Sequence, residues 1–207
     1  MPDGVTINGL PVDAGDHICV LHRGRSERHD LIVPFLQQGV RVGDKCICIS
    51  ATAERDRIRS KVLTGVSAEA DADLLQTEDF DSTYLRSGSF TGSHMLEYWR
   101  QWARDTFDEE GRKSARGTTD MSWAHDVLSP PLLDDLIAYE AQVTRFCRTY
   151  PQVALCLYDL DLFGGNVIFP VMRVHPKVLL SGILVENPYY LDPDELVPDQ
   201  VGVDAGS

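Results

Sequence analysis

Hydrophobic residues along the chain fall into short apolar runs that alternate with longer stretches of helical periodicity. Short, near-continuous apolar runs are typical of strands buried on both faces of a sheet. We predict strands at residues 15–22, 45–50, 74–75, 114–123, 153–158 and 178–185. Apolar residues at helical spacing predict helices at residues 31–38, 54–63, 95–107 (led into by residues 90–93), 130–150 and 167–174. Pro34 is expected to limit or kink the first helix, and Gly39 to end it.

Because strands and helices alternate from end to end, we predict an α/β fold: a doubly wound, mainly parallel sheet with helices on both faces. The chain has 207 residues, which suits one such domain. Residues 1–13 are punctuated by glycine and proline and are expected to form a loosely held N-terminal arm. We expect the folded domain at residues 14–192 and an acidic, Pro- and Asp-containing tail or linker at residues 193–207.

Acidic residues outnumber basic ones, and the formal net charge is −13 at pH 7. No basic block is present to neutralise phosphates, which argues against nucleic acid and anionic membranes as direct partners. The sequence has no apolar run of membrane-spanning length and no signal-peptide pattern. Its five cysteines, an odd number, lie mostly within apolar runs, as reduced buried thiols do. We therefore expect a cytoplasmic protein.

The first predicted strand carries the most distinctive side chains. Alternate residues of a strand share a face, so His17 and Cys19 lie side by side on one face, with Ile18 on the other. Two interpretations remain open: both residues belong to the core, or both line a binding site. Of the five thiols, Cys19 is the one expected to react, because His17 beside it could stabilise a thiolate.

The segment after this strand is where a nucleotide-binding protein of this architecture would place its phosphate-binding loop. The Gly-x-x-x-x-Gly-Lys-Ser/Thr pattern is absent there and in the rest of the sequence. We therefore expect ATP to bind weakly at best and not to be hydrolysed. Ligands of doubly wound sheets usually bind at the carboxyl ends of the strands. The side chains expected nearest to that rim are His22, Arg23, Ser50, Trp123, His125, Asp159 and Asp161.

Several separated motifs together resemble one family. They are Gly15-Asp16-His17-Ile18-Cys19, Pro34-Phe35-Leu36, Asp120-Met121-Ser122-Trp123-Ala124, Tyr139-Glu140-Ala141, Leu155-Cys156-Leu157-Tyr158-Asp159, Arg173-Val174-His175-Pro176 and Asn187-Pro188-Tyr189-Tyr190. In order and spacing they resemble the MEDS domain, a sensory domain of methanogens and methylotrophs, over roughly residues 14–192. The resemblance implies a RecA- or KaiC-like three-layer sandwich that has lost the phosphate-binding loop. It also implies a non-catalytic role in sensing hydrocarbon derivatives or other small molecules.

The same resemblance implies a ligand-binding pocket and a signalling partner. Its candidate pocket residues in this chain are His17, Cys19, Asp120, Trp123, Glu140 and His175. We find no helix-turn-helix segment and no kinase domain in the sequence. The signal is therefore expected to pass to a transcriptional or kinase partner, or to a fused effector.

Several alternatives stay open at this point. Glu140 lies in an apolar helical stripe, and it either faces solvent or is buried with His17 or an arginine as its partner. His175 either caps the end of a helix or joins the pocket. The chain could instead be a degenerate ATPase relative, or a metal-, haem- or redox-responsive module. No Cys-x-x-Cys spacing is present, and the candidate ligands of such a module are His17, Cys19, Cys46, Cys48 and Cys156.

Overall fold

The computed structural model describes residues 5–66 and 72–196. Its strands are β1 (Thr6–Ile7), β2 (Leu10–Pro11), β3 (His17–His22), β4 (Lys45–Ser50), β5 (Leu75–Asp79), β6 (Ala115–Asp120), β7 (Gln152–Asp159), β8 (Lys177–Leu180) and β9 (Ile183–Glu186). Its α-helices are α1 (Gly24–Val42), α2 (Thr52–Leu63), α4 (Gly92–Ala103), α5 (Pro130–Thr149), α6 (Gly165–Met172) and α7 (Pro193–Leu196). A π-helical turn (Arg104–Glu109) continues α4, and a 3₁₀ turn (Met121–Ala124) follows β6.

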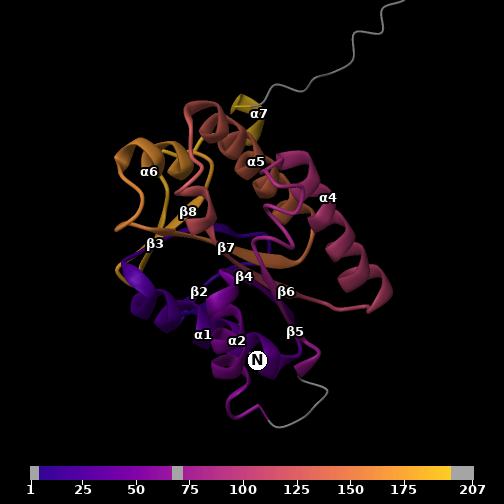
Figure 1. Ribbon diagram of the computed structural model, residues 1–207. Helices are drawn as coiled ribbons and strands as arrows, with labels where there is room; N and C mark the ends of the chain where they lie inside the picture. The colour runs from indigo at the N-terminus through magenta and orange to yellow at the C-terminus, as the bar shows by residue number, and fades with distance from the viewer. Residues whose placement is uncertain (1–4, 67–71, 197–207) are drawn as a thin grey trace, which may run out of the picture.

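Seven of the strands form one sheet, in the order β5-β4-β6-β7-β3-β8-β9. Neighbouring strands run parallel except for the last pair, β8 and β9. Helices α1 and α2 lie on one side of this sheet, and α4, α5 and α6 lie on the other (Figure 1). The predicted α/β fold with a mainly parallel sheet is confirmed.

The central strands are buried on both faces, as their apolar sequences predict. In β3, Ile18 and Val20 join the core beneath α1 and α2, whereas Cys19 and Leu21 join the core beneath α4, α5 and α6. Strand β7 follows the same alternation, with Cys156 and Tyr158 facing α5. The face covered by α5 is therefore the face on which His17 and Cys19 lie.

Helix α1 is longer than predicted in both directions. It starts at Gly24 and runs through Pro34 and Gly39 to Val42. Pro34 and Asp30 are both exposed, so the Asp30 carbonyl, which loses its helical partner, faces solvent and the helix can continue through Pro34. The helix ends at Gly43, which has φ = 88°. The prediction that Gly39 ends it is wrong, because Gly39 serves close packing: a Cβ there would lie 2.6 Å from Sγ of Cys46.

The predicted last strand, residues 178–185, is in fact the hairpin β8–β9. Leu180 pairs with Ile183, and the two residues between them, Ser181 and Gly182, both have positive φ, 50° and 75°. A two-residue turn of this kind matches the twist of an antiparallel pair. The single-strand prediction is therefore wrong. The pair Ser181-Gly182 is a turn signal that the prediction overlooked.

The described part of the N-terminal segment, residues 5–13, is more ordered than a loosely held arm. Strands β1 and β2 form a hairpin whose turn, Asn8-Gly9, again has two positive φ angles. Ile7 is fully buried in the core beneath α1. The expected tail, residues 193–207, lies outside the described residues except for α7.

No loop separates β3 from α1, since Arg23 alone joins the two elements. The backbone N–H of Gly24, the first residue of α1, donates a hydrogen bond to Oδ1 of Asp159 (3.1 Å), and Arg23 pairs with Asp161 (2.8 Å). Two carboxylates thus occupy the place where a phosphate-binding protein would offer backbone amides to its ligand. This end of the sheet is unsuited to a nucleotide phosphate.

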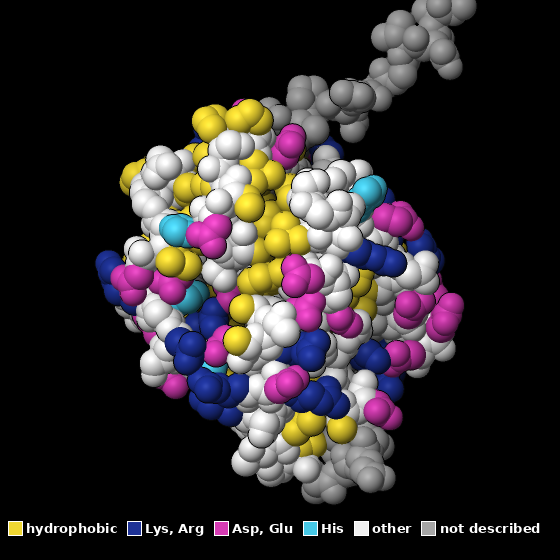
Figure 2. Space-filling model, viewed as in Figure 1, with side chains coloured by type: hydrophobic (Ala, Val, Ile, Leu, Met, Phe, Trp, Pro, Cys, Tyr) yellow, Lys and Arg dark blue, Asp and Glu magenta, His cyan; other side chains and the backbone are white. Residues whose placement is uncertain are grey.

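The surface carries mixed charge. On the face shown in Figure 2, Lys and Arg side chains are interleaved with Asp and Glu, and hydrophobic side chains gather where α5 and α6 lie. Within the described ranges, no helix has both the length and the hydrophobicity that a membrane span requires.

Candidate functional site

Four side chains with ligand-type atoms meet between the sheet and α5: His17, Glu140, Cys156 and His175, here called the buried quartet. Nε2 of His17 lies 3.2 Å from Sγ of Cys156 and 3.3 Å from Oε2 of Glu140. The same Oε2 lies 3.5 Å from Sγ of Cys156 and 3.7 Å from Nε2 of His175. Cys156 is 4% exposed and the other three are fully buried, so the quartet is closed to solvent.

The quartet draws its members from separate elements. His17 opens β3, and Cys156 lies on the same face of the neighbouring strand β7, whose Ala154 is the register partner of His17. Glu140 projects from the buried face of α5, and His175 lies in the connection between α6 and β8. The ring of His175 lies on that of His17, with 4.1 Å between centroids. The parallel pairing of β3, β7 and β8 therefore assembles the group.

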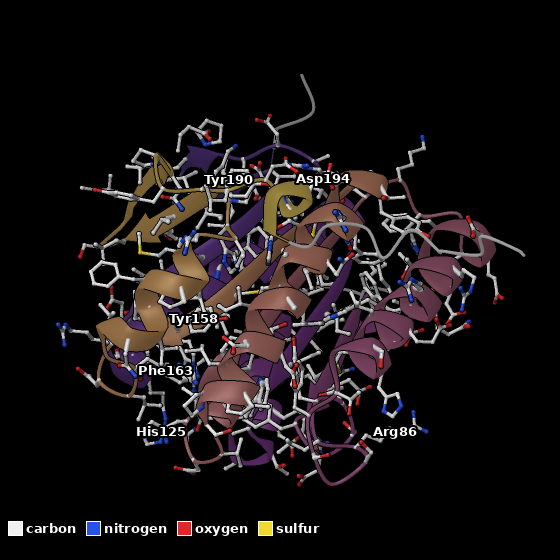
Figure 3. The ribbon with its side chains drawn as sticks, turned by 90° about the horizontal axis from the view of Figure 1, so that it is seen from above. Arg86, His125, Tyr158, Phe163, Tyr190 and Asp194 are labelled. Atoms are coloured by element: carbon white, nitrogen blue, oxygen red, sulfur yellow. The ribbon has the colours of Figure 1, made fainter. Side chains whose placement is uncertain are left out.

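A second layer of hydrogen bonds fixes the outward side of three members, His175, His17 and Glu140. Nδ1 of His175 donates to the carbonyl of Val171 (2.7 Å). The Thr144 hydroxyl donates to the carbonyl of Val174 (2.8 Å), so it accepts from Nδ1 of His17 (2.8 Å). The Tyr158 hydroxyl donates to Oε1 of Glu140 (2.7 Å). Tyr158 lies between α5 and α6 (Figure 3).

Burial and neighbouring charges set the protonation of the quartet. Burial acts to raise the pKa of Glu140, but its hydrogen bond with His17, its proximity to the His17 and His175 rings and its hydrogen bond with Tyr158 outweigh burial, so the pKa lies below its usual value. Burial lowers the pKa of His175 to about 3, which keeps that imidazole neutral. Burial, with the charge of Glu140, raises the pKa of Cys156 well above its usual value. Glu140 is thus a buried carboxylate whose partner is His17, one of the two partners considered from the sequence.

All five cysteines are buried and reduced. Burial raises the pKa of Cys46 to about 12 and that of Cys48 to about 11, and it raises the pKa of Cys19 and Cys147 further. The expected reactivity of Cys19 is wrong, because burial and the charge of Glu140 both disfavour its thiolate. His17 directs its ring to Cys156 instead.

We therefore expect the native protein to resist brief alkylation at neutral pH at all five cysteines, whereas the unfolded protein is labelled at each. Mass spectrometry after a short iodoacetamide pulse, with and without urea, measures this. Rapid labelling of any cysteine in the native protein would contradict the burial described here.

The structure brings together three of the six predicted pocket residues, His17, Glu140 and His175, and places Cys19 on the same sheet face. Asp120 lies on the opposite face, paired with Arg28 of α1, and it accepts a hydrogen bond from the backbone N–H of Ser122 (3.0 Å). Arg28 also approaches Glu54 (3.6 Å). Asp120 therefore secures the start of α1 and the turn after β6, and the sheet separates it from the quartet.

Trp123, the remaining predicted pocket residue, belongs to an aromatic cluster on the α5 side of the sheet. Its ring lies 4.9 Å from those of Tyr84 and Phe90, between centroids. The Tyr139 hydroxyl accepts a hydrogen bond from Nε1 of Trp99 (2.8 Å) and bonds the Tyr84 hydroxyl (3.0 Å). Because Tyr139 precedes Glu140 on α5, the cluster borders the quartet.

A small cavity lies between this cluster and the quartet. Its volume is about 20 Å³, and its wall includes both aromatic side chains and Cys156. The full lining is Tyr84, Trp99, Trp102, Gly117, Thr119, Tyr139, Val143, Phe146, Cys147, Gln152, Ala154 and Cys156. Tyr84 also lines an open groove of about 560 Å³ beside α4. One buried tyrosine therefore lines both spaces.

The metal-ligand set considered from the sequence is only partly brought together. Cys46 and Cys48 lie in the core beneath α1 and α2, on the far side of the sheet from His17.

Two residues that support the quartet, Thr144 and Tyr158, were not predicted. The spacing held a signal for both, since Thr144 lies one helical turn after Glu140 and Tyr158 shares a strand face with Cys156.

Comparison with known proteins gives two matches. The sequence pattern of the MEDS family, described as the methanogen/methylotroph, DcmR sensory domain, matches residues 16–176. The transcriptional repressor DcmR of Methylorubrum extorquens (strain DSM 6343 / CIP 106787 / DM4) is 24% identical over 171 residues. This alignment covers 82% of the present chain and 61% of the repressor, so the chain matches less than two thirds of that relative.

Proposed function

The chain belongs to the MEDS family of sensory domains, and we propose that it senses a small apolar molecule, such as a one-carbon hydrocarbon derivative, in the cavity beside the buried quartet. In this proposal the chain is not an enzyme, and ligand binding alters its contacts with a transcriptional or kinase partner. The relative that it matches is a transcriptional repressor, which supports an output in gene regulation.

The observation that carries this proposal is the cavity. About 20 Å³ is room for little more than one water-sized group, and Trp99, Trp102 and Phe146 make much of the wall apolar. A ligand enclosed there would contact α4, α5 and β7 together. Binding would therefore change how α4 and α5 pack on the sheet, and a partner protein could detect that change.

The connection from β3 to α1 supports the part of the proposal that concerns lineage. We propose a RecA- or KaiC-like fold whose phosphate-binding loop has been lost. Its support is the single-residue connection at Arg23, together with the carboxylates of Asp159 and Asp161 beside it. Sensing in this proposal therefore uses the interior beneath α5 in place of the carboxyl rim of the sheet.

We expect methanol, methanethiol and chloromethane to raise the melting temperature of the protein and to change the fluorescence of Trp99 and Trp102. Butanol, butanethiol and chlorobutane should have neither effect, because they are too large for the cavity. Ala154→Leu fills the cavity and should abolish the response, because Ala154 lines it. The matched control is Ala138→Leu, the same substitution at an exposed position of α5. The measurement is a thermal melt with each compound at equal concentration. An equal response of the wild type and Ala154→Leu would refute the cavity as the binding site.

A further inference from the structure

The hydrogen atoms of the two histidines in the buried quartet point outward. Nδ1–H of His175 donates to the Val171 carbonyl. Nδ1–H of His17 donates to the Thr144 hydroxyl, which in turn donates its own proton to the Val174 carbonyl. Each imidazole therefore directs Nε2 into the quartet, where its lone pair can bind a cation once that nitrogen carries no proton. Metal-binding histidines show this arrangement, in which the outer N–H donates to a carbonyl or another fixed acceptor.

One inward atom is buried without a hydrogen-bond partner. Nε2 of His175 has none among the described residues, although the side chain is fully buried. Leaving such a nitrogen unsatisfied is unfavourable, because it loses its hydrogen bond to water and gains none in the protein. Its nearest charged neighbour is Oε2 of Glu140 (3.7 Å), which is itself an acceptor when ionised. A cation between these atoms would satisfy both.

The spacing of the inward atoms matches a tetrahedral ion. Zinc bonds of about 2.0–2.3 Å place neighbouring tetrahedral donors about 3.3–3.6 Å apart. The separations among Nε2 of His17, Sγ of Cys156 and Oε2 of Glu140 are 3.2, 3.3 and 3.5 Å. Among any three donors of a square-planar site, one pair would lie opposite each other, about 4 Å or more apart. The triangle thus favours tetrahedral coordination.

The donor set also selects the ion. Two imidazoles, one carboxylate and one thiolate suit zinc, whereas magnesium and calcium require mainly oxygen ligands. A doubly charged cation balances the two negative charges that Glu140 and a deprotonated Cys156 would carry in this buried place. We propose that His17, Glu140, Cys156 and His175 bind one zinc ion in a closed, four-ligand site.

This proposal extends beyond the sensory function and does not depend on the cavity ligand. Because Cys156 both joins the quartet and lines the cavity, a molecule bound there would contact the metal's sulfur ligand directly. The ion would tie β3, α5, β7 and the α6–β8 connection together. Its site is formed by folding, so binding stabilises the native state.

The test uses the whole chain, stripped with a chelator and titrated with zinc or cobalt(II). We expect one ion per chain, a raised melting temperature, and for cobalt the visible bands of tetrahedral coordination with a thiolate-to-cobalt charge-transfer band in the near ultraviolet. Absence of binding by the wild type, or an octahedral cobalt spectrum without the sulfur band, would overturn the proposal.

Variants assign the ligands. Cys156→Ser should remove the charge-transfer band and weaken zinc binding by about tenfold or more, and His175→Gln should weaken it similarly. The matched controls are Cys48→Ser and His22→Gln, which change a buried thiol and a buried imidazole outside the quartet and should leave zinc affinity unchanged. Should the quartet variants bind zinc as tightly as the wild type, the assignment is wrong.

Discussion

Replacing Arg116 with methionine is expected to lower the free energy of unfolding by about 3–5 kcal/mol. Arg116 is 1% exposed, and its guanidinium donates to Oδ2 of Asp44 (2.7 Å), to the Phe35 carbonyl (2.9 Å) and to Oε1 of Gln38 (2.8 Å). Methionine fills much of the same volume but leaves the buried Asp44 carboxylate without its cation. The expected loss of stability therefore comes mainly from the unpaired charge of Asp44, and less from a cavity.

Urea unfolding at neutral pH measures the effect of Arg116→Met. The control is Arg100→Met, since Arg100 is a half-exposed arginine paired with Glu97 across 3.5 Å, and its loss should cost less than about 1 kcal/mol. Adding Asp44→Asn to Arg116→Met should recover part of the loss, because the orphaned charge is then removed. A double variant less stable than the single one would contradict this explanation.

Replacing Glu140 with alanine should destabilise the chelator-treated protein by about 3–5 kcal/mol, whereas glutamine should cost clearly less. Alanine leaves the Tyr158 hydroxyl without its acceptor and removes the carboxylate beside Nε2 of His17, in a closed interior. A glutamine oxygen can still accept from Tyr158, and its amide can donate to Nε2 of His17. Urea midpoints of both variants in chelator measure the difference.

Chelation keeps this comparison separate from any metal effect. If glutamine destabilises as much as alanine, the charge of Glu140, and not its hydrogen bonds, stabilises the apoprotein. Equal stability of all three proteins would mean that the quartet contributes nothing to the fold.

The sheet could be predicted from the sequence more closely than its surroundings. Strand β4 has its predicted bounds, and β3 begins two residues after the predicted start, because burial on both faces leaves only apolar residues between the ends of each strand. The start of α1 could not be predicted, since Arg23, Gly24 and Arg25 carry no hydrophobic periodicity. Its first turns are instead held by Arg28, through the pair with Asp120 across the sheet end.

The candidate site was predictable in part. The period of a strand placed His17 and Cys19 on one face, and the cost of burying Glu140 required a cation or proton donor near it. Which face Asp120 occupies depends on the length of β6 and the turn after it, which hydrophobic pattern does not fix. The joining of His17 and Cys156 depends on strand order, and strand order is a property of the whole fold.

The position of β3 in the sheet also bears on how the chain is made. This strand is among the first to be synthesised, yet both of its neighbours, β7 and β8, come from the last third of the described chain. His17 and Cys156 are 139 residues apart. Pairings so distant in sequence close late and slow folding. During translation both hydrogen-bonding edges of β3 stay unpaired until β7 is made, so the nascent chain passes through a period in which aggregation competes with folding.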